Sequence, residues 1–261
     1  MRVLMVGDIV GSPGRRRFRE VVGRLRRDGE AHLVVANVEN AAAGSGLTPA
    51  LAQELLAAGA DVLTLGDHAW GRKELAGWID AEPRVIRPLN FAPECPGRGL
   101  VTVQSDHGPL TVISLLGRVF MPPVDCPFRA IDALLPRKVP GGVPVVVDFH
   151  AEATSEKIAM GLFLDGRVAA LVGTHTHVQT ADARCLPGGT AYCTDLGMTG
   201  PLHSVIGREV EPVLQKFTTG MPARFEVAKG PATLEGVLID IDPATCRARG
   251  IRAIREPEDD T

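Results

Sequence analysis

The stretch RVLMVGDIVGSPGRRRFREVVGRLRRD, residues 2–28, contains an apolar run followed by a helical pattern. The run over residues 2–7 is short and almost wholly apolar, which predicts a buried strand. Ser12 and Pro13 then predict a helix start, because serine caps a helix well and proline suits its first turn. Apolar residues share one face of the helix expected over 13–28, with arginines elsewhere. A strand that leads directly into such a helix indicates a layered α/β fold.

The same alternation of apolar run and helical pattern continues along the chain. Strands are predicted over residues 32–38 and 61–65, and helices over 48–59 and 71–80. This repeated strand–helix order implies that the strands pair in parallel.

The second half of the chain predicts a further sheet. Residues 99–104 and 109–116 alternate around a central Asp-His-Gly turn, which suggests a hairpin. A strand, a helix and a strand are then expected over 143–149, 154–164 and 168–172.

The C-terminal part predicts a short helix near residues 209–217 and two or three antiparallel strands that end near residue 254. The polar residues 254–261 are expected to be a frayed tail. Because no repeat, linker or low-complexity block interrupts the pattern, residues 1–261 are expected to form a single domain with two central sheets.

Composition excludes several classes of protein. The net charge of −3 provides no basic surface for long nucleic acids, and aromatic residues make up only 4% of the chain. The longest apolar runs fall short of the roughly 20 residues that a membrane span needs. The N-terminus lacks a signal-peptide pattern, and the five cysteines form no C-x-x-C pair. A cytoplasmic protein with reduced thiols is expected.

Chemistry-bearing residues follow five of the predicted strands. The ligand crevice of an open α/β sheet lies just beyond the carboxyl ends of its strands. The residues expected to meet there are Asp8, Glu39, Asn40, Asp67, His68, His150, His175 and His177.

Each of these residues also has an ordinary structural explanation. Asp8 could cap a helix, Glu39 and Asn40 could form a turn, and His150 could be a hydrogen-bonded core histidine. As a set they favour a metal site, because four of the seven histidines fall at strand ends beside carboxylates. Ordinary turns would use serine and glycine at such positions.

The ligand types indicate which metals and which reaction fit. Carboxylate oxygens and imidazole nitrogens without thiolates suit Fe, Mn, Zn or Co. Seven candidate ligands exceed what one ion needs, whereas two ions about 3.5 to 4 Å apart, joined by a carboxylate, would use them. Such pairs suit the hydrolysis of phosphoesters. His175 and His177 are expected to reach adjacent ions, since a two-residue step along extended backbone points both side chains to the same side.

The order of these residues is similar to that of the calcineurin-like metallophosphoesterases, and more closely to their bacterial YmdB-type branch. The segments that carry the resemblance are GDIVGSPGRR (7–16), NVENAAAGSGLT (37–48), LGDHAW (65–70), DFHAEATSEK (148–157), GTHTHVQTAD (173–182) and TDLGMTGP (194–201). The resemblance implies a four-layer α/β/β/α sandwich with a dinuclear metal centre at the sheet edge. It also implies iron, with manganese or zinc as alternatives, and a phosphodiesterase acting on small phosphodiesters such as 2′,3′-cyclic nucleotides. A homo-oligomer, dimer or tetramer, is expected on the same ground.

The resemblance also implies a role for each site residue. One ion would bind Asp8, Glu39, Asn40 and His177, and the other Glu39, Asp67, His150 and His175. Glu39 would bridge the ions, and His68 would protonate the leaving alkoxide or stabilise the phosphoryl group. Asp148 could orient His150 from behind, or could simply cap a strand end.

Two positions depart from the wider pattern. Val10 replaces the histidine of the usual Asp-x-His, and Asn40 could supply an oxygen in its place. Asp67 stands where the family usually has asparagine, which adds a negative charge at the second metal. That charge should bind the metal more tightly, lower its Lewis acidity and repel a phosphate, so a shifted metal preference or lower activity is expected.

Two other functions remain open. The chain could be a regulatory protein that binds metal or nucleotide with little turnover, an alternative that Asp67 keeps open. A metal-dependent amidohydrolase fits less well, because its His-x-His pair lies on the first strand of an eight-stranded barrel. Here the pair is at residues 175–177, and eight strand–helix units are lacking.

Overall fold

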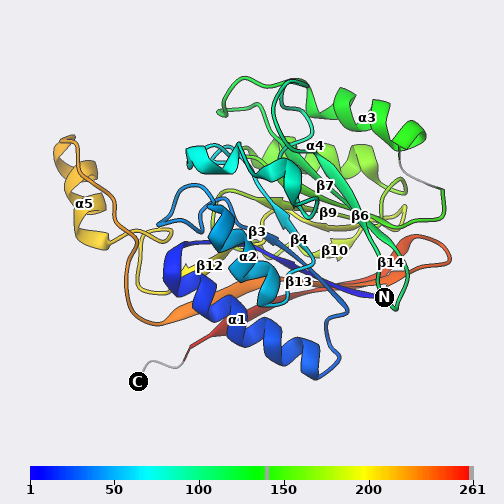
Figure 1. The fold of residues 1–261 in the computed structure, drawn as a ribbon, viewed down its shortest axis with the longest axis horizontal. Coiled ribbons are helices and arrows are strands. Elements are labelled where there is room, and N and C mark those ends of the chain that lie inside the picture. Colours follow the sequence, from blue (N-terminus) through cyan, green and yellow to red (C-terminus); the bar gives the residue numbers. More distant parts are fainter. Residues whose placement is uncertain (139–140, 259–261) are drawn as a thin grey trace.

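Two β-sheets lie at the centre of the structure, a computed structural model that describes residues 1–138 and 141–258 (Figure 1). The first sheet has the strand order β2 (Asp8–Ile9), β12 (Met198–Pro201), β13 (Ala232–Asp242), β1 (Arg2–Val6), β3 (Leu33–Asn37), β4 (Val62–Thr64) and β5 (Val85–Ile86), and β14 (Arg247–Pro257) pairs with β13. Strands β1, β3, β4 and β5 pair in parallel, as the repeated strand–helix order predicts.

The second sheet comes from the middle of the chain. Its strand order is β10 (Arg184–Cys185), β11 (Ala191–Cys193), β9 (Ala170–Thr174), β8 (Val145–His150), β7 (Leu110–Leu116) and β6 (Leu100–Val103). Strands β7, β8, β9 and β11 are parallel. The antiparallel pairing of β6 with β7 confirms the predicted hairpin.

Helices cover the outer faces of both sheets (Figure 1). On the first sheet lie α1 (Gly11–Arg27) and α2 (Pro49–Ala57), and on the second lie α3 (Pro127–Lys138) and α4 (Thr154–Leu164). Helix α5 (Val210–Thr219) projects to one side of the sheets, and η1 (Lys73–Leu75) and η2 (Ile79–Ala81) are 3₁₀ turns. Thr48 caps α2 by accepting a hydrogen bond from the backbone N–H of Leu51. The start of α1 differs from its prediction, because Val10 occupies the cap position and Ser12 lies within the first turn.

Three hydrophobic clusters pack these elements against one another. One packs α1 and α2 against the first sheet, a second lies between the two sheets, and a third packs α3 and α4 against the second sheet. Alternate residues of β1 serve different clusters, since Leu4 faces the helices while Val3 and Met5 face the other sheet. Because both faces of these strands are buried, their sequences are continuous apolar runs.

Two helical segments differ from the sequence-based expectation. The α-helix expected over 71–80 is instead the pair η1 and η2, and Gly77 between them disfavours a continuous helix. Helix α3 was not predicted, because residues 117–127 carry three prolines and resemble a loop. The helix starts at the last of these, Pro127, a position that suits proline.

The expected frayed tail over 254–261 is wrong for residues 254–257. These residues belong to β14 and pair with β13, with Ile254 opposite Gly236. The ladder uses backbone groups, so polar side chains do not prevent it. Glu258 then accepts hydrogen bonds from the backbone of Ala232 and the guanidinium of Arg16. Residues 259–261 lie outside the described part of the chain.

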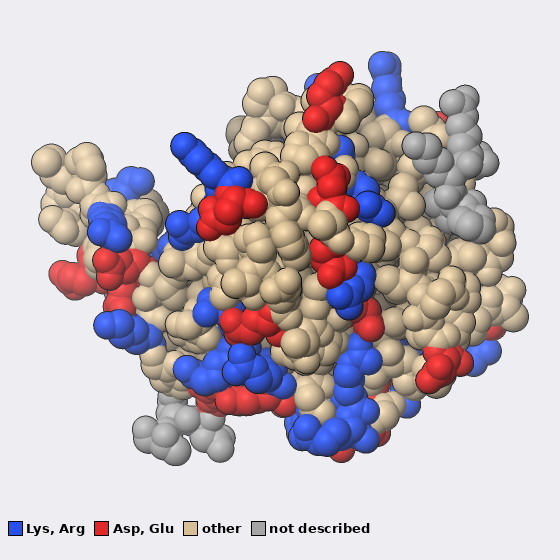
Figure 2. Space-filling model, in the orientation of Figure 1, with Lys and Arg blue, Asp and Glu red and all other residues tan. Residues whose placement is uncertain are grey.

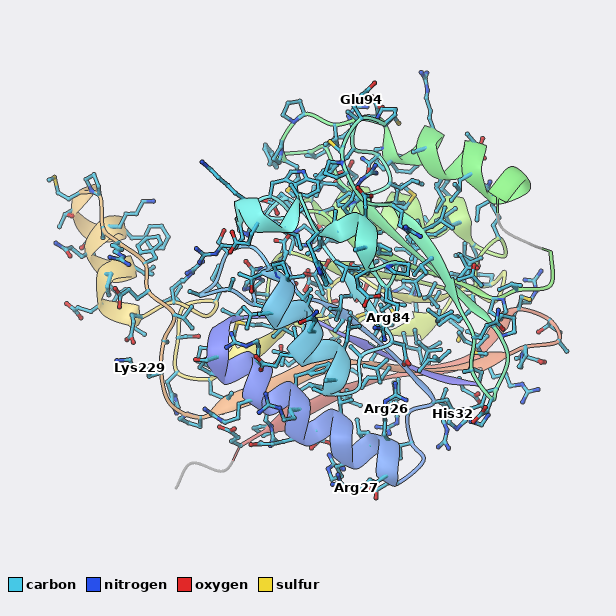
Figure 3. All side chains as sticks on the ribbon, viewed as in Figure 1. Arg26, Arg27, His32, Arg84, Glu94 and Lys229 are labelled. Atoms are coloured by element: carbon cyan, nitrogen blue, oxygen red, sulfur yellow. The ribbon has the colours of Figure 1, made fainter. Side chains whose placement is uncertain are left out.

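Charged residues are interspersed on the face shown in Figure 2. Some of them connect elements, as Arg26 does near the end of α1 (Figure 3). It donates to the carbonyl of Gly59 and pairs with Asp61, which fixes α1 against the segment entering β4. Within the described ranges, none of the helices is long and apolar enough to cross a membrane.

Candidate metal centre

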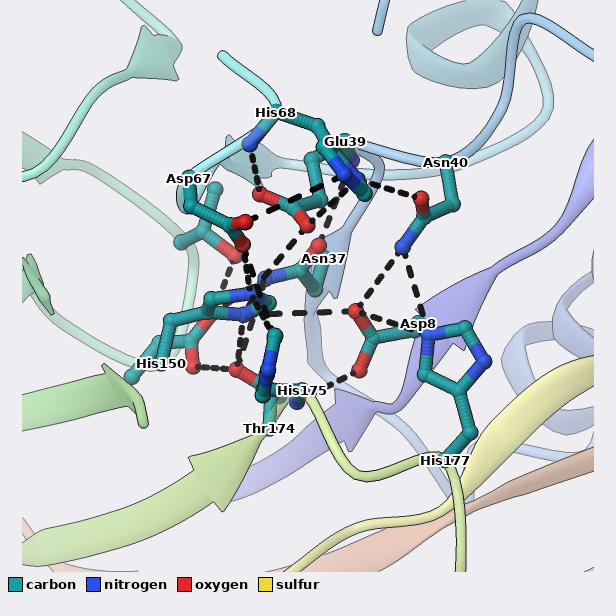
Figure 4. A network of polar contacts seen from close by, with 12 residues as sticks. Asp8, Asn37, Glu39, Asn40, Asp67, His68, His150, Thr174, His175 and His177 are labelled. Carbon is teal, nitrogen blue, oxygen red and sulfur yellow. Dashed lines mark hydrogen bonds and ion pairs between the residues drawn. The ribbon is translucent and has the colours of Figure 1, made fainter. Parts of the chain in front are cut away.

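All eight residues predicted from the strand ends lie together at one edge of the two sheets (Figure 4). Asp8 begins β2, and Glu39 and Asn40 follow β3. The LGDHAW segment after β4 brings Asp67 and His68, His150 ends β8, and His175 and His177 follow β9. The site is therefore assembled from both sheets.

Four of these residues form a compact group, here named the quartet: Glu39, Asp67, His150 and His175. One ligand atom from each lies within 4.8 Å of the others. His150 Nε2 is 3.1 Å from Glu39 Oε1, 3.0 Å from Asp67 Oδ1 and 3.0 Å from His175 Nδ1. Two imidazole nitrogens and two carboxylates thus converge on one point.

Asp8, Asn40 and His177 form a second group, here named the trio. The Asn40 side-chain N–H lies 3.3 Å from both Asp8 Oδ1 and His177 Nε2, and His177 Nε2 is 3.6 Å from Asp8 Oδ1. The oxygen of Asn40 faces His68 Nδ1 at 2.9 Å. The amide nitrogen, and not the expected oxygen, faces the trio in this orientation, and rotation of the amide by 180° would exchange them.

Glu39 of the quartet has a buried oxygen without a hydrogen bond. Its Oε2 accepts the backbone N–H of His68 at 3.0 Å, whereas the buried Oε1 has no hydrogen-bond partner of suitable geometry. A buried carboxylate oxygen without a donor is unfavourable unless a cation binds it. Gly66 allows this approach, because a Cβ there would lie 2.2 Å from the His150 ring and 2.5 Å from Glu39 Oε2.

The three imidazoles share one arrangement, in which one ring nitrogen faces the site and the other contacts an acceptor outside it. Thr174 Oγ1 donates to Asp148 at 2.7 Å, so its lone pair accepts from His150 Nδ1 at 2.9 Å. His175 Nε2 lies 3.2 Å from a carboxylate oxygen of Glu152. His177 Nδ1 donates to the carbonyl of Ile206 at 3.0 Å.

This arrangement is typical of metal-bound histidine, because the outer acceptor fixes the tautomer and leaves a lone pair facing inward. It also answers the question about Asp148. That carboxylate acts on His150 through Thr174, and it accepts a second hydrogen bond from Thr64 Oγ1 at 2.5 Å. It is therefore more than a strand-end cap.

Without a metal ion, protons on the histidines would balance the carboxylates at the site. In the described part of the chain, the ion pairs of Asp8, Glu39 and Asp67 are all with histidines. Burial by itself would lower the pKa of His150, but the carboxylates of Glu39 and Asp67 raise that pKa well above its ordinary value. Burial by itself would raise the pKa of Asp8, but His177 and His150 hold it well below its usual range. Metal ions would replace these protons as the balancing charge.

The GTHTH loop has a conformation that the sequence did not predict. His175 and His177 have positive φ angles of 101° and 63°, so the extended backbone expected here is wrong. Such angles are strained for residues other than glycine and need support from their surroundings. Asp195 supplies it by accepting the backbone N–H of Thr176 at 3.2 Å and its hydroxyl at 2.7 Å. The fully buried Lys157 pairs with Asp195 at 2.6 Å.

His68 lies at the rim of the site. Its side chain is 41% exposed, whereas that of His150 is fully buried. The contact of His68 Nδ1 with the carboxylate of Glu39, 3.3 Å away, raises the pKa of His68 against the effect of burial, and the charge of Asp67 adds to this rise. An imidazole in this position can carry a proton close to an incoming ligand.

Sequence reasoning missed the residues that support the ligands. Glu152, Lys157 and Asp195 were within the DFHAEATSEK and TDLGMTGP segments, but nothing in those segments indicated what they contact. A lysine and an aspartate 38 positions apart become partners only through the fold.

The chain matches known proteins over nearly its whole length. A family model described as YmdB-like protein matches residues 4–254. A Bacillus subtilis protein named 2′,3′-cyclic-nucleotide 2′-phosphodiesterase is 48% identical over 254 residues, which cover 97% of this chain and 96% of that protein. A solved structure of a hypothetical protein from Thermus thermophilus has 43% identity and a TM-score of 0.93, covering 99% of this chain and 100% of that one. A structure of a novel phosphatase from Mycoplasma pneumoniae has 35% identity and a TM-score of 0.93, covering 100% and 94%.

Proposed function

The chain belongs to the YmdB-like family, and we propose that it is a metal-dependent phosphodiesterase that hydrolyses 2′,3′-cyclic nucleotides or related small phosphodiesters. Two transition-metal ions would occupy the site. The quartet would hold one ion, the trio together with Glu39 would hold the other, and Glu39 would bridge them.

The observation that carries this proposal is the orientation of the three imidazoles. Each of His150, His175 and His177 has one nitrogen beside an outer acceptor and one directed at buried carboxylates. The inward nitrogens converge on one another and on carboxylates, as does His150 Nε2, which lies 3.0 Å from both Asp67 Oδ1 and His175 Nδ1, and such a cluster suits a shared cation. The buried Oε1 of Glu39, which has no hydrogen bond, is further support for a bridging role.

The metal ions would supply Lewis acidity, which stabilises the phosphoryl oxygens and activates a water molecule at neutral pH. The side chains supply position and a proton. Asp8, Glu39 and Asp67 would hold the metal ions, while His68 lies at the exposed side of the site. When the P–O bond to the leaving group breaks, protonated His68 would donate its Nε2 proton to the departing alkoxide.

Several finer features belong to the same proposal. We infer that the metal is iron, with manganese or zinc as alternatives, because the ligands are oxygen and nitrogen without thiolate. The three hydrophobic clusters support a four-layer α/β/β/α sandwich formed by a single domain. The free cysteines are consistent with the reducing cytoplasm. Exposed apolar residues on α5, such as Leu214 and Phe217, are consistent with a homo-oligomer, dimer or tetramer.

A second candidate function is a regulatory protein that binds metal or nucleotide with weak turnover. The observation in its favour is Asp67, whose carboxylate faces the quartet, 3.0 Å from His150 Nε2. This additional negative charge would reduce Lewis acidity and repel a phosphate.

Turnover separates the two candidates. Metal-loaded protein should hydrolyse bis-p-nitrophenyl phosphate and 2′,3′-cyclic AMP. His68→Ala should lower kcat by about 10²- to 10⁴-fold, the usual contribution of a general acid, while metal content stays unchanged. His107→Ala, at a histidine that stacks on His32 away from the site, is the matched control. If the protein loaded with iron, manganese, zinc or cobalt hydrolysed neither substrate, the regulatory role would be favoured.

A further inference from the structure

A cavity opens directly beside the quartet. Its volume is about 600 Å³, within the range of small-molecule sites, and Asp67 forms part of its wall. The other walls come from Trp70 in the LGDHAW segment, from Phe91 and from the loop that contains Pro122 and Pro123. One residue, Asp67, therefore belongs both to the candidate metal centre and to this cavity.

The surface of this cavity suits a flat, uncharged ring. The ring centroids of Trp70 and Phe91 are 6.3 Å apart and tilted by 39°, and Leu116 adds an aliphatic surface. The charged residues in its wall are Asp67 and Asp125, both acidic. A phosphate would be repelled here, whereas aromatic faces attract the π-face of any nucleobase.

Another cavity that adjoins the site lies beside His177 and has a different character. Its lining includes Glu235 and Arg255 together with hydroxyl groups, and it has no phenylalanine, tyrosine or tryptophan. The broad apolar rings on which a base stacks best therefore lie on the Asp67 side of the site.

We propose that the cavity beside Asp67 binds the base of the cyclic nucleotide, stacked on Trp70, while the cyclic phosphate occupies the metal centre. This proposal deepens the phosphodiesterase function and depends on it for the position of the phosphate. It makes Trp70 a specificity-determining residue, since a phosphodiester without a base gains nothing from the aromatic wall.

The chain offers a matched control for Trp70. Its two tryptophans, Trp70 and Trp78, are both partly buried and pack against the same hydrophobic cluster, but only Trp70 lines the cavity. A purely structural role would therefore make Trp70→Leu and Trp78→Leu similar, whereas a base-binding role separates them.

The first experiment compares steady-state kinetics on 2′,3′-cyclic AMP and on methyl ribofuranoside 2,3-cyclic phosphate, which lacks the base. Trp70→Leu should raise KM for the nucleotide about tenfold with little change in kcat, as expected for the loss of one stacked base. It should leave the baseless substrate unaffected, and Trp78→Leu should change neither. Equal effects of Trp70→Leu on both substrates, or equal KM values of the unmodified protein for both, would overturn the proposal.

The second experiment does not require turnover. In Trp78→Phe, Trp70 is the only tryptophan, and adenosine should quench its fluorescence saturably, with no comparable effect of ribose. Quenching without hydrolysis would mean that the base site exists and the phosphodiesterase function fails. Hydrolysis without quenching would retain the function and reject the base site.

Discussion

The quartet and the trio lie side by side but are built differently. The quartet offers four carboxylate or imidazole ligands, and His150 at its centre is fully buried at the end of β8. The trio offers one carboxylate, one imidazole and an amide, and its His177 is fixed by the carbonyl of Ile206 in an exposed loop. Each group has one strand residue, His150 of β8 or Asp8 of β2, and its other members follow strands, so the groups differ mainly in the charge and number of their ligands. A metal bound by the quartet should be held more tightly than one bound by the trio.

Loss of the proposed bridging ligand should have the largest effect, because Glu39 would serve both groups. Glu39→Gln removes the negative charge and replaces one carboxylate oxygen with an amide nitrogen, which binds metal poorly. We expect both metals to be lost on dialysis and activity to fall by more than about 100-fold, beyond what loss of an outer partner causes. Glu54→Gln on α2, whose partners are Arg15 and Arg19, is the control. Retention of two metals by Glu39→Gln would contradict the bridging role.

Substitution of one histidine from each group tests the difference between them directly. His150→Ala should empty the quartet and also lower stability, since it leaves a cavity beneath buried carboxylates. His177→Ala should retain about one metal per chain and the stability of the parent. Metal analysis and thermal unfolding measure both effects. Equal losses of metal and of thermal stability in the two variants would mean that the quartet and the trio bind metal as a single site.

Asp195 supports the GTHTH loop, which carries His175 of the quartet and His177 of the trio, so its substitution should affect metal binding by both groups. Asp195→Asn leaves Lys157 buried and unpaired, which should lower the free energy of unfolding by about 3 to 5 kcal/mol. Metal affinity should fall about 10- to 100-fold, because Thr176 between the two histidines loses a charged acceptor. Adding Lys157→Met should recover stability but not metal affinity. Recovery of both would mean that Asp195 serves stability alone.

The smallest effect is expected at Asp67, where only charge changes within the quartet. Asp67→Asn should weaken metal retention, because it removes a negatively charged ligand. It should raise turnover a few-fold, because a neutral ligand reduces the Lewis acidity of the metal less than a carboxylate does and repels phosphate less. Metal content and kcat should therefore move in opposite directions. If neither changed, the extra charge at this position would have no role.

The positions of the site residues were largely predictable from the sequence. Asp8, Asn40 and Asp67 could be placed because parallel strands direct their carboxyl ends to a common edge, and strand periodicity is a local signal. Four histidines at strand ends made a metal site the best explanation. The same local signals predicted the hairpin of β6 and β7 and the capped start of α2.

What the sequence did not predict depends on contacts between distant segments. The orientation of His175 requires Glu152, and the strained GTHTH backbone requires Asp195 and Lys157, none of which follows from spacing. The strand pairing of residues 254–257 comes from a backbone ladder that side-chain composition does not reveal. The cavity beside Trp70 is formed by three separate segments and exists only in the folded chain.

The most direct test of the proposed dinuclear centre is elemental analysis of freshly purified protein, with kinetics on 2′,3′-cyclic AMP measured on the same sample. Two transition-metal ions per chain are expected. Chelation should remove the metal bound by the trio first, and turnover should then be abolished. Later removal of the metal bound by the quartet should lower the unfolding temperature. A sample with full turnover and less than one metal per chain, or one whose turnover survives exhaustive chelation, would contradict the account.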